Sequence, residues 1–183
     1  MTDQQVTQEQ YEQLIDDVSY LQDEAEALKY IIDQVPYAEN PPDGMSIYQM
    51  LRLIDYAQTD YYRPIVEKVF SENRTVNLSD YIAFEETFEI PEEEKIDIQK
   101  ALSKIIKHRA GLINIFRKIP LIDWERKVKD EGNRTISLFT FANKMIRTER
   151  KILRDIADLV MIYQKEKQSQ REIDKKVEQR KST

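Results

Sequence analysis

The sequence predicts an all-α protein, a four-helix bundle with a long connection between its second and third helices. Four long segments repeat apolar residues at steps of three and four, the spacing of one helix face. Only three glycines occur among 183 residues, fewer than the turns of a strand-rich fold usually need. Between the second and third segments, residues 73–91 form a polar, acidic connection.

The first helix is predicted over residues 7–35. Pro36 ends it, and the sequence NPPDG at residues 40–44 is a strong loop signal. Its apolar stripe contains no charge, as in the seam of a bundle. The stripe consists of Leu14, Val18, Leu21, Ala25, Leu28 and Ile32.

The second helix begins after Ser46, a predicted N-cap with Gln49 as its capping-box partner, and reaches about residue 72. Pro64 is expected to kink it, because proline lacks a backbone donor and clashes with the preceding turn. Its stripe is Ile47, Met50, Ile54, Ala57, Tyr61 and Ile65. Tyr48, Tyr56, Tyr61 and Tyr62 are interpreted as core or boundary packing, with stacking on a ligand as the less favoured alternative.

The connection at residues 73–91 contains the stretch YIAFEETFEIP, which alternates apolar and polar residues. This pattern fits either a short strand or a helical turn. Six glutamates between residues 85 and 94 make the region acidic. We interpret them as a solvated surface rather than a cation site, and those after Pro91 as suited to a helix N-terminus.

The third helix is predicted from near Pro91 to about Lys118, and Pro120 stops it. A loop with Trp124 and the sequence EGN leads to the fourth helix, which begins near Ser137. The third stripe is Ile98, Leu102, Ile105, Ile106, Ile113 and Phe116. The fourth stripe is Leu138, Phe141, Met145, Ile152, Ile156, Leu159 and Tyr163.

Residues 1–165 are predicted to form a single four-helix-bundle domain. Residues 166–183 are predicted to be a charged helical extension or a disordered tail. The reason is that Ile173 and Val177 are their only large apolar residues.

The composition excludes several classes of function. The net charge of −6 leaves no basic footprint for nucleic acid and disfavours anionic membrane surfaces. No stretch approaches the roughly 18 apolar residues of a membrane span. The absence of cysteine excludes disulfides, zinc–thiolate sites and thiol nucleophiles. The N-terminal residues do not resemble a signal peptide, so a cytoplasmic protein is expected, without nucleic-acid or membrane partners.

The sequence nominates no catalytic residue and no cofactor. Its one histidine, His108, lies off the third stripe and is interpreted as a surface or boundary residue without a nominated catalytic partner. A di-iron carboxylate site would need Glu-x-x-His on two helices. The three glycines are too scattered for a phosphate-binding loop.

Two charges lie on apolar stripes. Arg109 is near the centre of the third stripe, and Glu149 is near the centre of the fourth. Because an unpaired buried charge is costly, we hypothesise that the two side chains form an ion pair inside the bundle or at one mouth of it. In the alternative, each side chain extends outward to solvent on its own.

Two segments resemble the DinB-like family, which includes YfiT-type metal-dependent hydrolases and thiol transferases. GMSIYQMLRLIDYAQTDYY (residues 44–62) is similar to the family's loop and second helix, where a Trp-Ser pair precedes a metal-binding histidine seven residues after the serine. SLFTFANKMIRTERKILRDI (residues 137–156) is similar to its fourth helix, with two metal-binding histidines four residues apart. The resemblance implies a four-helix bundle and, in many members, a homodimer.

The metal-ligand positions depart from the family. They carry Leu53, Thr148 and Ile152, and Met45 stands where the tryptophan would precede the serine. Leucine and isoleucine cannot coordinate a metal, and a neutral hydroxyl is a poor donor for zinc or nickel. A one-residue shift would offer Asp55 or Glu149 but no histidine triad. No metal is therefore expected, and the chain is interpreted as a divergent member with a degenerate metal site.

Three functions are compatible with these observations. The first is a metal-free bundle that acts as a non-catalytic binding or interaction protein of unknown ligand. The second is a metal-dependent thiol transferase or hydrolase with a displaced site near Asp60, Thr148 and Glu149. The third is a small-ligand sensor with a tyrosine-lined pocket. Residues singled out as candidate pocket or buried polar groups are Asp60, Tyr61, Arg109, Thr148 and Glu149.

Overall fold

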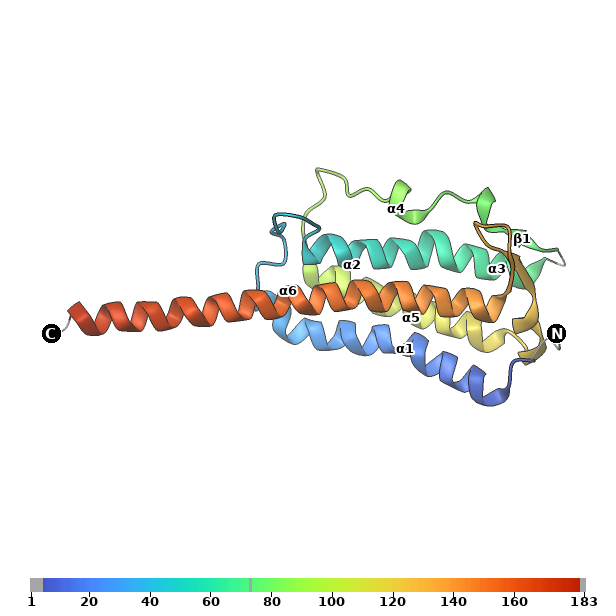
Figure 1. The fold of residues 1–183 in the computed structure, drawn as a ribbon, viewed down its shortest axis with the longest axis horizontal. Coiled ribbons are helices and arrows are strands. Elements are labelled where there is room, and N and C mark those ends of the chain that lie inside the picture. Colours follow the sequence, from blue (N-terminus) through green and yellow to red (C-terminus); the bar gives the residue numbers. More distant parts are fainter. Residues whose placement is uncertain (1–4, 73, 182–183) are drawn as a thin grey trace.

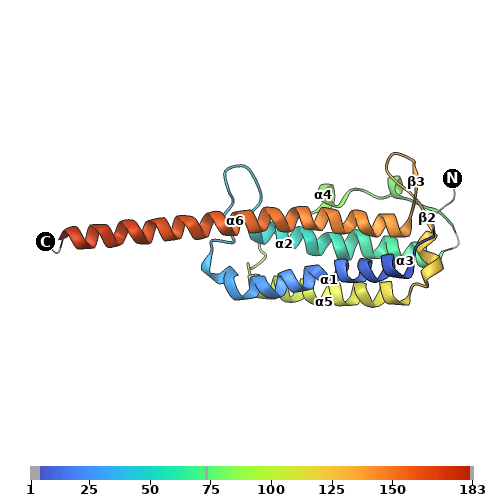
Figure 2. The ribbon, with the colours of Figure 1, turned by 60° about the horizontal axis from the view of Figure 1, so that its bottom comes forward.

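The protein is a bundle of four long helical segments that lie side by side (Figure 1 and Figure 2). The computed structural model describes residues 5–72 and 74–181. The segments are α1 (Gln8–Ile31), the run from α2 (Ile47–Tyr56) to α3 (Arg63–Ser71), α5 (Ile98–Lys118) and α6 (Leu138–Lys181). Both α5 and α6 contact α1 and α2, so the four segments enclose a common core.

Side-chain caps set the helix starts. Ser46 and Gln49 form the predicted capping box at the start of α2. By contrast, the third helix does not begin near Pro91. Residues 91–94 form only a turn, and α5 begins at Ile98, because the Asp97 carboxylate accepts the backbone N–H of Lys100 at 2.9 Å.

The interruption expected around Pro64 is present as a π-helical stretch, η2 (Ala57–Tyr62), between α2 and α3. At its end the backbone N–H of Arg63 bonds to the carbonyl of Gln58, one residue further back than in an α-helix. Pro64 follows in the first turn of α3, where a missing N–H is tolerated. The stretch buries Gln58, Tyr61 and Tyr62.

A small three-stranded sheet lies at the end of the bundle opposite the C-terminal extension (Figure 2). β1 (Val76–Asn77) pairs in parallel with β2 (Lys127–Lys129), which pairs antiparallel with β3 (Thr135–Ser137). The connection after α3 then runs back along the outer side of α2 and α3 (Figure 1). It contains a short helix, α4 (Phe84–Thr87). Of the two alternatives for the stretch YIAFEETFEIP (residues 81–91), the helical turn is therefore present as α4, and the short strand β1 lies before this stretch.

The core is divided into two apolar clusters along the bundle axis. The first gathers side chains near the sheet, including Phe116, Trp124 and Phe141. The second, toward the other end, includes Ile54 and Ile105. The polar residues Gln58, Arg109 and Glu149 are also buried.

The buried face of α6 differs from the predicted stripe. Leu153 and Val160 are buried, whereas Ile152, Leu159 and Tyr163 are only half-buried. Because α6 contacts both α1 and α2, its buried face is wider than a single line of residues. In the second half of the bundle segment, this face is also shifted by one residue from the predicted stripe.

Beyond the bundle, α6 continues to Lys181 as one projecting helix (Figure 1). Its side chains are exposed from Gln164 to Lys181. Lys167 donates a hydrogen bond to the Gln34 carbonyl at 3.2 Å, close to the end of the bundle body. Within the described residues, no helix combines the length and the apolar character needed to span a membrane.

Candidate functional site

A buried polar layer crosses the bundle between the two apolar clusters, with Arg109 at its centre. The Arg109 side chain is completely buried and forms the expected ion pair with Glu149 of α6. It also donates to the Gln58 side-chain oxygen at 3.1 Å and to the Val18 carbonyl of α1 at 3.3 Å. The guanidinium, carried by α5, thus bonds to each of the other three helical segments.

The layer continues from Gln58 to the surface. The Gln58 side-chain N–H₂ donates to Asp55 at 2.9 Å and to the Ile105 carbonyl at 3.3 Å. The Asp55 carboxylate lies 2.8 Å from Nδ1 of His108, whose side chain is 34% exposed. His108 is a boundary residue, as predicted, but it does have a carboxylate partner that the sequence did not indicate. The only sequence signal was the i, i+3 spacing of Asp55 and Gln58 within a largely apolar segment.

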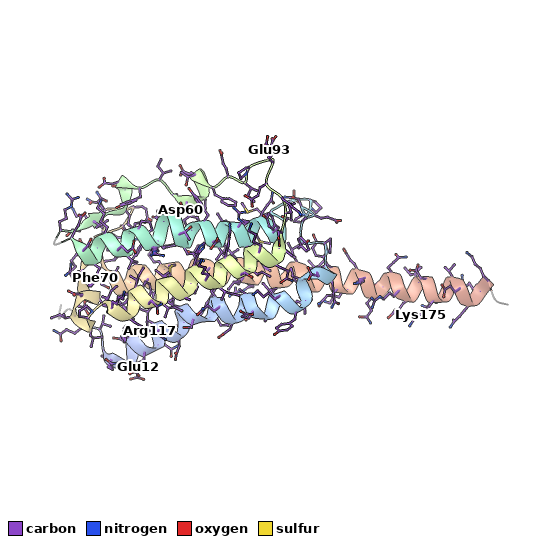
Figure 3. The ribbon with its side chains drawn as sticks, turned by 180° about the vertical axis from the view of Figure 1, so that it is seen from behind. Glu12, Asp60, Phe70, Glu93, Arg117 and Lys175 are labelled. Carbon is purple, nitrogen blue, oxygen red and sulfur yellow. The ribbon has the colours of Figure 1, made fainter. Side chains whose placement is uncertain are left out.

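Asp60 and Glu149 are not brought together. Asp60 lies on the outer side of the second helical segment (Figure 3) and is exposed, so its assignment as a buried polar residue is wrong. Its carboxylate accepts a hydrogen bond from Thr59. In the π-helical stretch the inward positions are taken by Gln58, Tyr61 and Tyr62, which leaves Asp60 facing solvent.

A pocket of about 170 Å³ opens between the π-helical stretch, the connection and α6. Its aromatic wall consists of Tyr61, Tyr62, Phe84 and Phe141. Tyr61 and Tyr62 meet edge to face with ring centres 5.1 Å apart, and Phe84 packs within 5.7 Å of both. We call this cavity the aromatic pocket. Its remaining side chains include Thr148, Lys144, Glu85 and Glu131.

The two tyrosines of the pocket keep their protons strongly. Burial raises the pKa of Tyr61 to about 12, and the nearby carboxylates of Glu131 and Glu85 add to the effect. Burial also raises the pKa of Tyr62, with Glu149 and Glu85 contributing and a hydrogen bond with Thr148 opposing. Both phenols are therefore neutral at pH 7 and stay neutral well into the alkaline range.

The architecture matches a known structure. YfiT from Bacillus subtilis superposes with a TM-score of 0.69 over 87% of this chain and 90% of that one, at 10% sequence identity. The chain has the YfiT fold. The predicted all-α four-helix bundle is thereby confirmed. YfiT is described as a probable metal-dependent hydrolase with an unusual four-helix bundle topology. No protein-family model and no curated protein matches the sequence.

On this YfiT fold, the positions that the family resemblance assigns to metal ligands do not fit a metal. Leu53 lies in the first apolar cluster, and Ile152 packs against both clusters. Thr148 offers one hydroxyl, which donates to the Lys144 carbonyl at 3.1 Å. Among residues 5–72 and 74–181, no three histidine or carboxylate side chains are grouped so that they could hold a metal ion.

Proposed function

We propose that this protein is a non-catalytic binding protein that uses the YfiT fold without a metal centre and takes a small molecule in the aromatic pocket. One observation carries the proposal. Thr148, at a position where the family places a metal-binding histidine, instead lines an aromatic cavity of about 170 Å³. Small-molecule sites are typically concave, mostly apolar and equipped with a few polar groups, as this pocket is.

The polar layer supports this proposal because it fills the centre of the bundle. Arg109, Glu149 and Gln58 satisfy one another there, so these groups already have partners within the protein. A ligand is then expected in the aromatic pocket rather than at the centre of the bundle. In this proposal the polar layer stabilises the fold, and the aromatic pocket binds the small molecule.

Metal analysis and a binding screen test the proposal. Purified protein is expected to contain no stoichiometric zinc or nickel. Small molecules that occupy the pocket are expected to raise the melting temperature, since a ligand selective for the folded state stabilises it. Thr148→Leu, which narrows the pocket, should abolish the shift. Lys151→Leu, an exposed change one turn away on α6, should preserve it. Stoichiometric metal in the purified protein would contradict the proposal.

Catalysis at a displaced site is the second candidate, and one contact favours it. The 2.8 Å contact between Asp55 and His108 supplies the carboxylate partner that orients a general-base imidazole. The set Asp60, Thr148 and Glu149 gives less support to catalysis. The Asp60 carboxylate already accepts a hydrogen bond from the Thr59 hydroxyl, and the Glu149 carboxylate is already paired with the Arg109 guanidinium. An esterase or thiol-transfer activity that disappears in His108→Gln, with the fold intact by circular dichroism, would favour this candidate over the first.

A further inference from the structure

We propose that the aromatic pocket binds the ammonium group of a small organic cation. The inference rests on the proposed function, since it assigns a ligand class to the same cavity. It goes further in stating which charge and which chemical group the cavity selects. Three properties of the lining support it: the aromatic walls, the balance of charge and the volume.

The walls present aromatic rings from three separate elements. Tyr61 and Tyr62 come from the π-helical stretch, Phe84 from α4 and Phe141 from α6, with the Tyr62 and Phe141 ring centres 5.6 Å apart. The face of an aromatic ring is electron-rich and attracts a cation within about 6 Å. Quaternary and methylated ammonium groups are recognised by clusters of aromatic rings, because their charge is spread over methyl groups that also need apolar surroundings.

The charges at the pocket favour the same sign of ligand. Glu85 and Glu131 contribute −2 and Lys144 contributes +1, which leaves a formal charge of −1 around the cavity. The Lys144 ammonium is 3.3 Å from a Glu131 oxygen, so these two charges offset each other. An anionic ligand would face both the remaining carboxylate and the negative ring faces. A neutral ligand would gain no charge–charge attraction from Glu85.

The volume limits the ligand to a small group. A cavity of roughly 150 Å³ can hold a molecule the size of benzene. The aromatic pocket, at about 170 Å³, is large enough for a trimethylammonium group but not for a large cofactor. Glu85 and Glu131 are exposed members of the lining, so the rest of a longer ligand would extend into solvent past them.

Calorimetry with two matched probes tests the assignment on the full-length protein. Choline carries the trimethylammonium group, and 3,3-dimethylbutan-1-ol has nearly the same shape without the charge. Choline is expected to bind at least about fivefold more tightly, the factor that corresponds to roughly 1 kcal/mol of cation–π attraction. Equal or tighter binding of the neutral alcohol would overturn the assignment.

Charge variants test the same point without touching the core. Glu85→Gln should weaken choline binding several-fold and leave binding of the neutral alcohol unchanged, because it removes only a carboxylate. Glu86→Gln, its exposed neighbour outside the pocket, should leave both unchanged. Lys144→Met should tighten choline binding, because it removes a competing positive charge. If Glu85→Gln and Glu86→Gln bind choline equally, the assignment fails.

An aromatic variant tests the ring faces. Phe84→Leu keeps an apolar side chain but removes one face, so it should weaken choline several-fold. The control is Tyr56→Leu, which removes a ring that packs against Phe88 of the same connection but does not line the pocket. Equal choline binding by Phe84→Leu and Tyr56→Leu would overturn the ring assignment.

The outcomes separate this inference from the proposed function. If neither choline nor tetramethylammonium binds at millimolar concentration, but neutral or anionic molecules do bind in a manner blocked by Thr148→Leu, the cation assignment fails and the binding function stands. If the protein instead carries stoichiometric zinc or nickel, the proposed function itself fails, whatever the cations do.

Discussion

Arg109 shows how one side chain connects four helical segments. It is completely buried, yet each of its three bonding nitrogens has an acceptor on a different segment. A buried ion pair often adds little net stability, because desolvation opposes the attraction. Removing one partner is different, since the other charge is then left buried and uncompensated.

Arg109→Met is therefore expected to lower the free energy of unfolding by about 3–5 kcal/mol, measured by urea denaturation. Arg109→Met combined with Glu149→Leu should recover most of that loss, because no lone charge remains. The control is Arg150→Met, which breaks the partly exposed pair with Asp17 and should cost no more than about 1 kcal/mol. A single Arg109→Met variant as stable as the wild type would contradict the assigned role.

The pocket tyrosines predict a dependence of stability on alkaline pH. Tyr61 titrates near pH 12 in the folded protein but near pH 10 when unfolded, so the unfolded chain loses its proton first. The contribution of the protonated Tyr61 phenol to the free energy of unfolding is complete below about pH 10 and is lost as the pH rises toward 12.

In Tyr61→Phe, stability should consequently fall less steeply over this range, as followed by denaturation midpoints and phenolate absorbance. Tyr30→Phe is the control, since that side chain is 82% exposed and should leave the curve unchanged. Identical slopes for Tyr61→Phe and the wild type would show that the phenol is not protected by the fold.

At the scale of elements, the β2–β3 hairpin depends on one carboxylate. Asp130 accepts the backbone N–H groups of Gly132 and Arg134 and pairs with the Arg134 guanidinium. The backbone N–H of Arg134 is the main cause that lowers the pKa of Asp130 below its usual range. The ionised form therefore stabilises the fold.

That contribution is present above the unfolded pKa and is lost as the pH falls through the lowered folded pKa. Asp130→Asn should reduce the melting temperature at pH 7, and the difference from the wild type should shrink on acidification. Asp43→Asn, in an exposed loop, serves as the control. A difference that stays constant down to about pH 3 would contradict the assigned ionisation.

Sequence periodicity predicted the long helices because a helix that buries one face has apolar residues at regular steps of three and four. Arg109 and Glu149 were also visible, since charges on an apolar stripe demand a partner. Gln58 was less visible, because the π-helical stretch changes which residues face inward. The Phe84 wall was not predictable, since it depends on where the connection folds back over the bundle. Asp97 was missed as a cap because Pro91 gave an earlier start signal.

At the scale of the whole molecule, the bundle and the projecting end of α6 differ in what stabilises them. The bundle buries two apolar clusters, whereas the projecting end has only exposed side chains. Most of the stability of a helix in a protein comes from the packing of its apolar face rather than from helix propensity alone. The projecting end is thus expected to unfold locally long before the bundle does.

Truncation after Lys167 should lower the helical signal in circular dichroism but change the melting temperature by no more than about 2 °C, since surface changes have small effects. The control is truncation after Ile152, which removes Leu153, Ile156 and Val160 from the second cluster and should unfold the bundle. A large fall in melting temperature for the variant that ends at Lys167 would show that the projecting end packs against another part of the protein or against a second copy of it. That result, with a change in sedimentation, would support the homodimer expected from the family resemblance.

The polar layer also has a consequence for how the helices align along the bundle axis. Apolar stripes alone would tolerate a slide of α6 by one turn, about 5.4 Å, because one branched alkyl group replaces another. With the polar layer in place, the same slide would move the Glu149 carboxylate among apolar side chains and leave the buried Arg109 guanidinium without its ion-pair partner. The polar layer thus specifies one axial register of the helices, as single buried polar residues do in coiled coils. The aromatic pocket, whose lining comes from the π-helical stretch, the connection, the β2–β3 turn and α6, depends on that register.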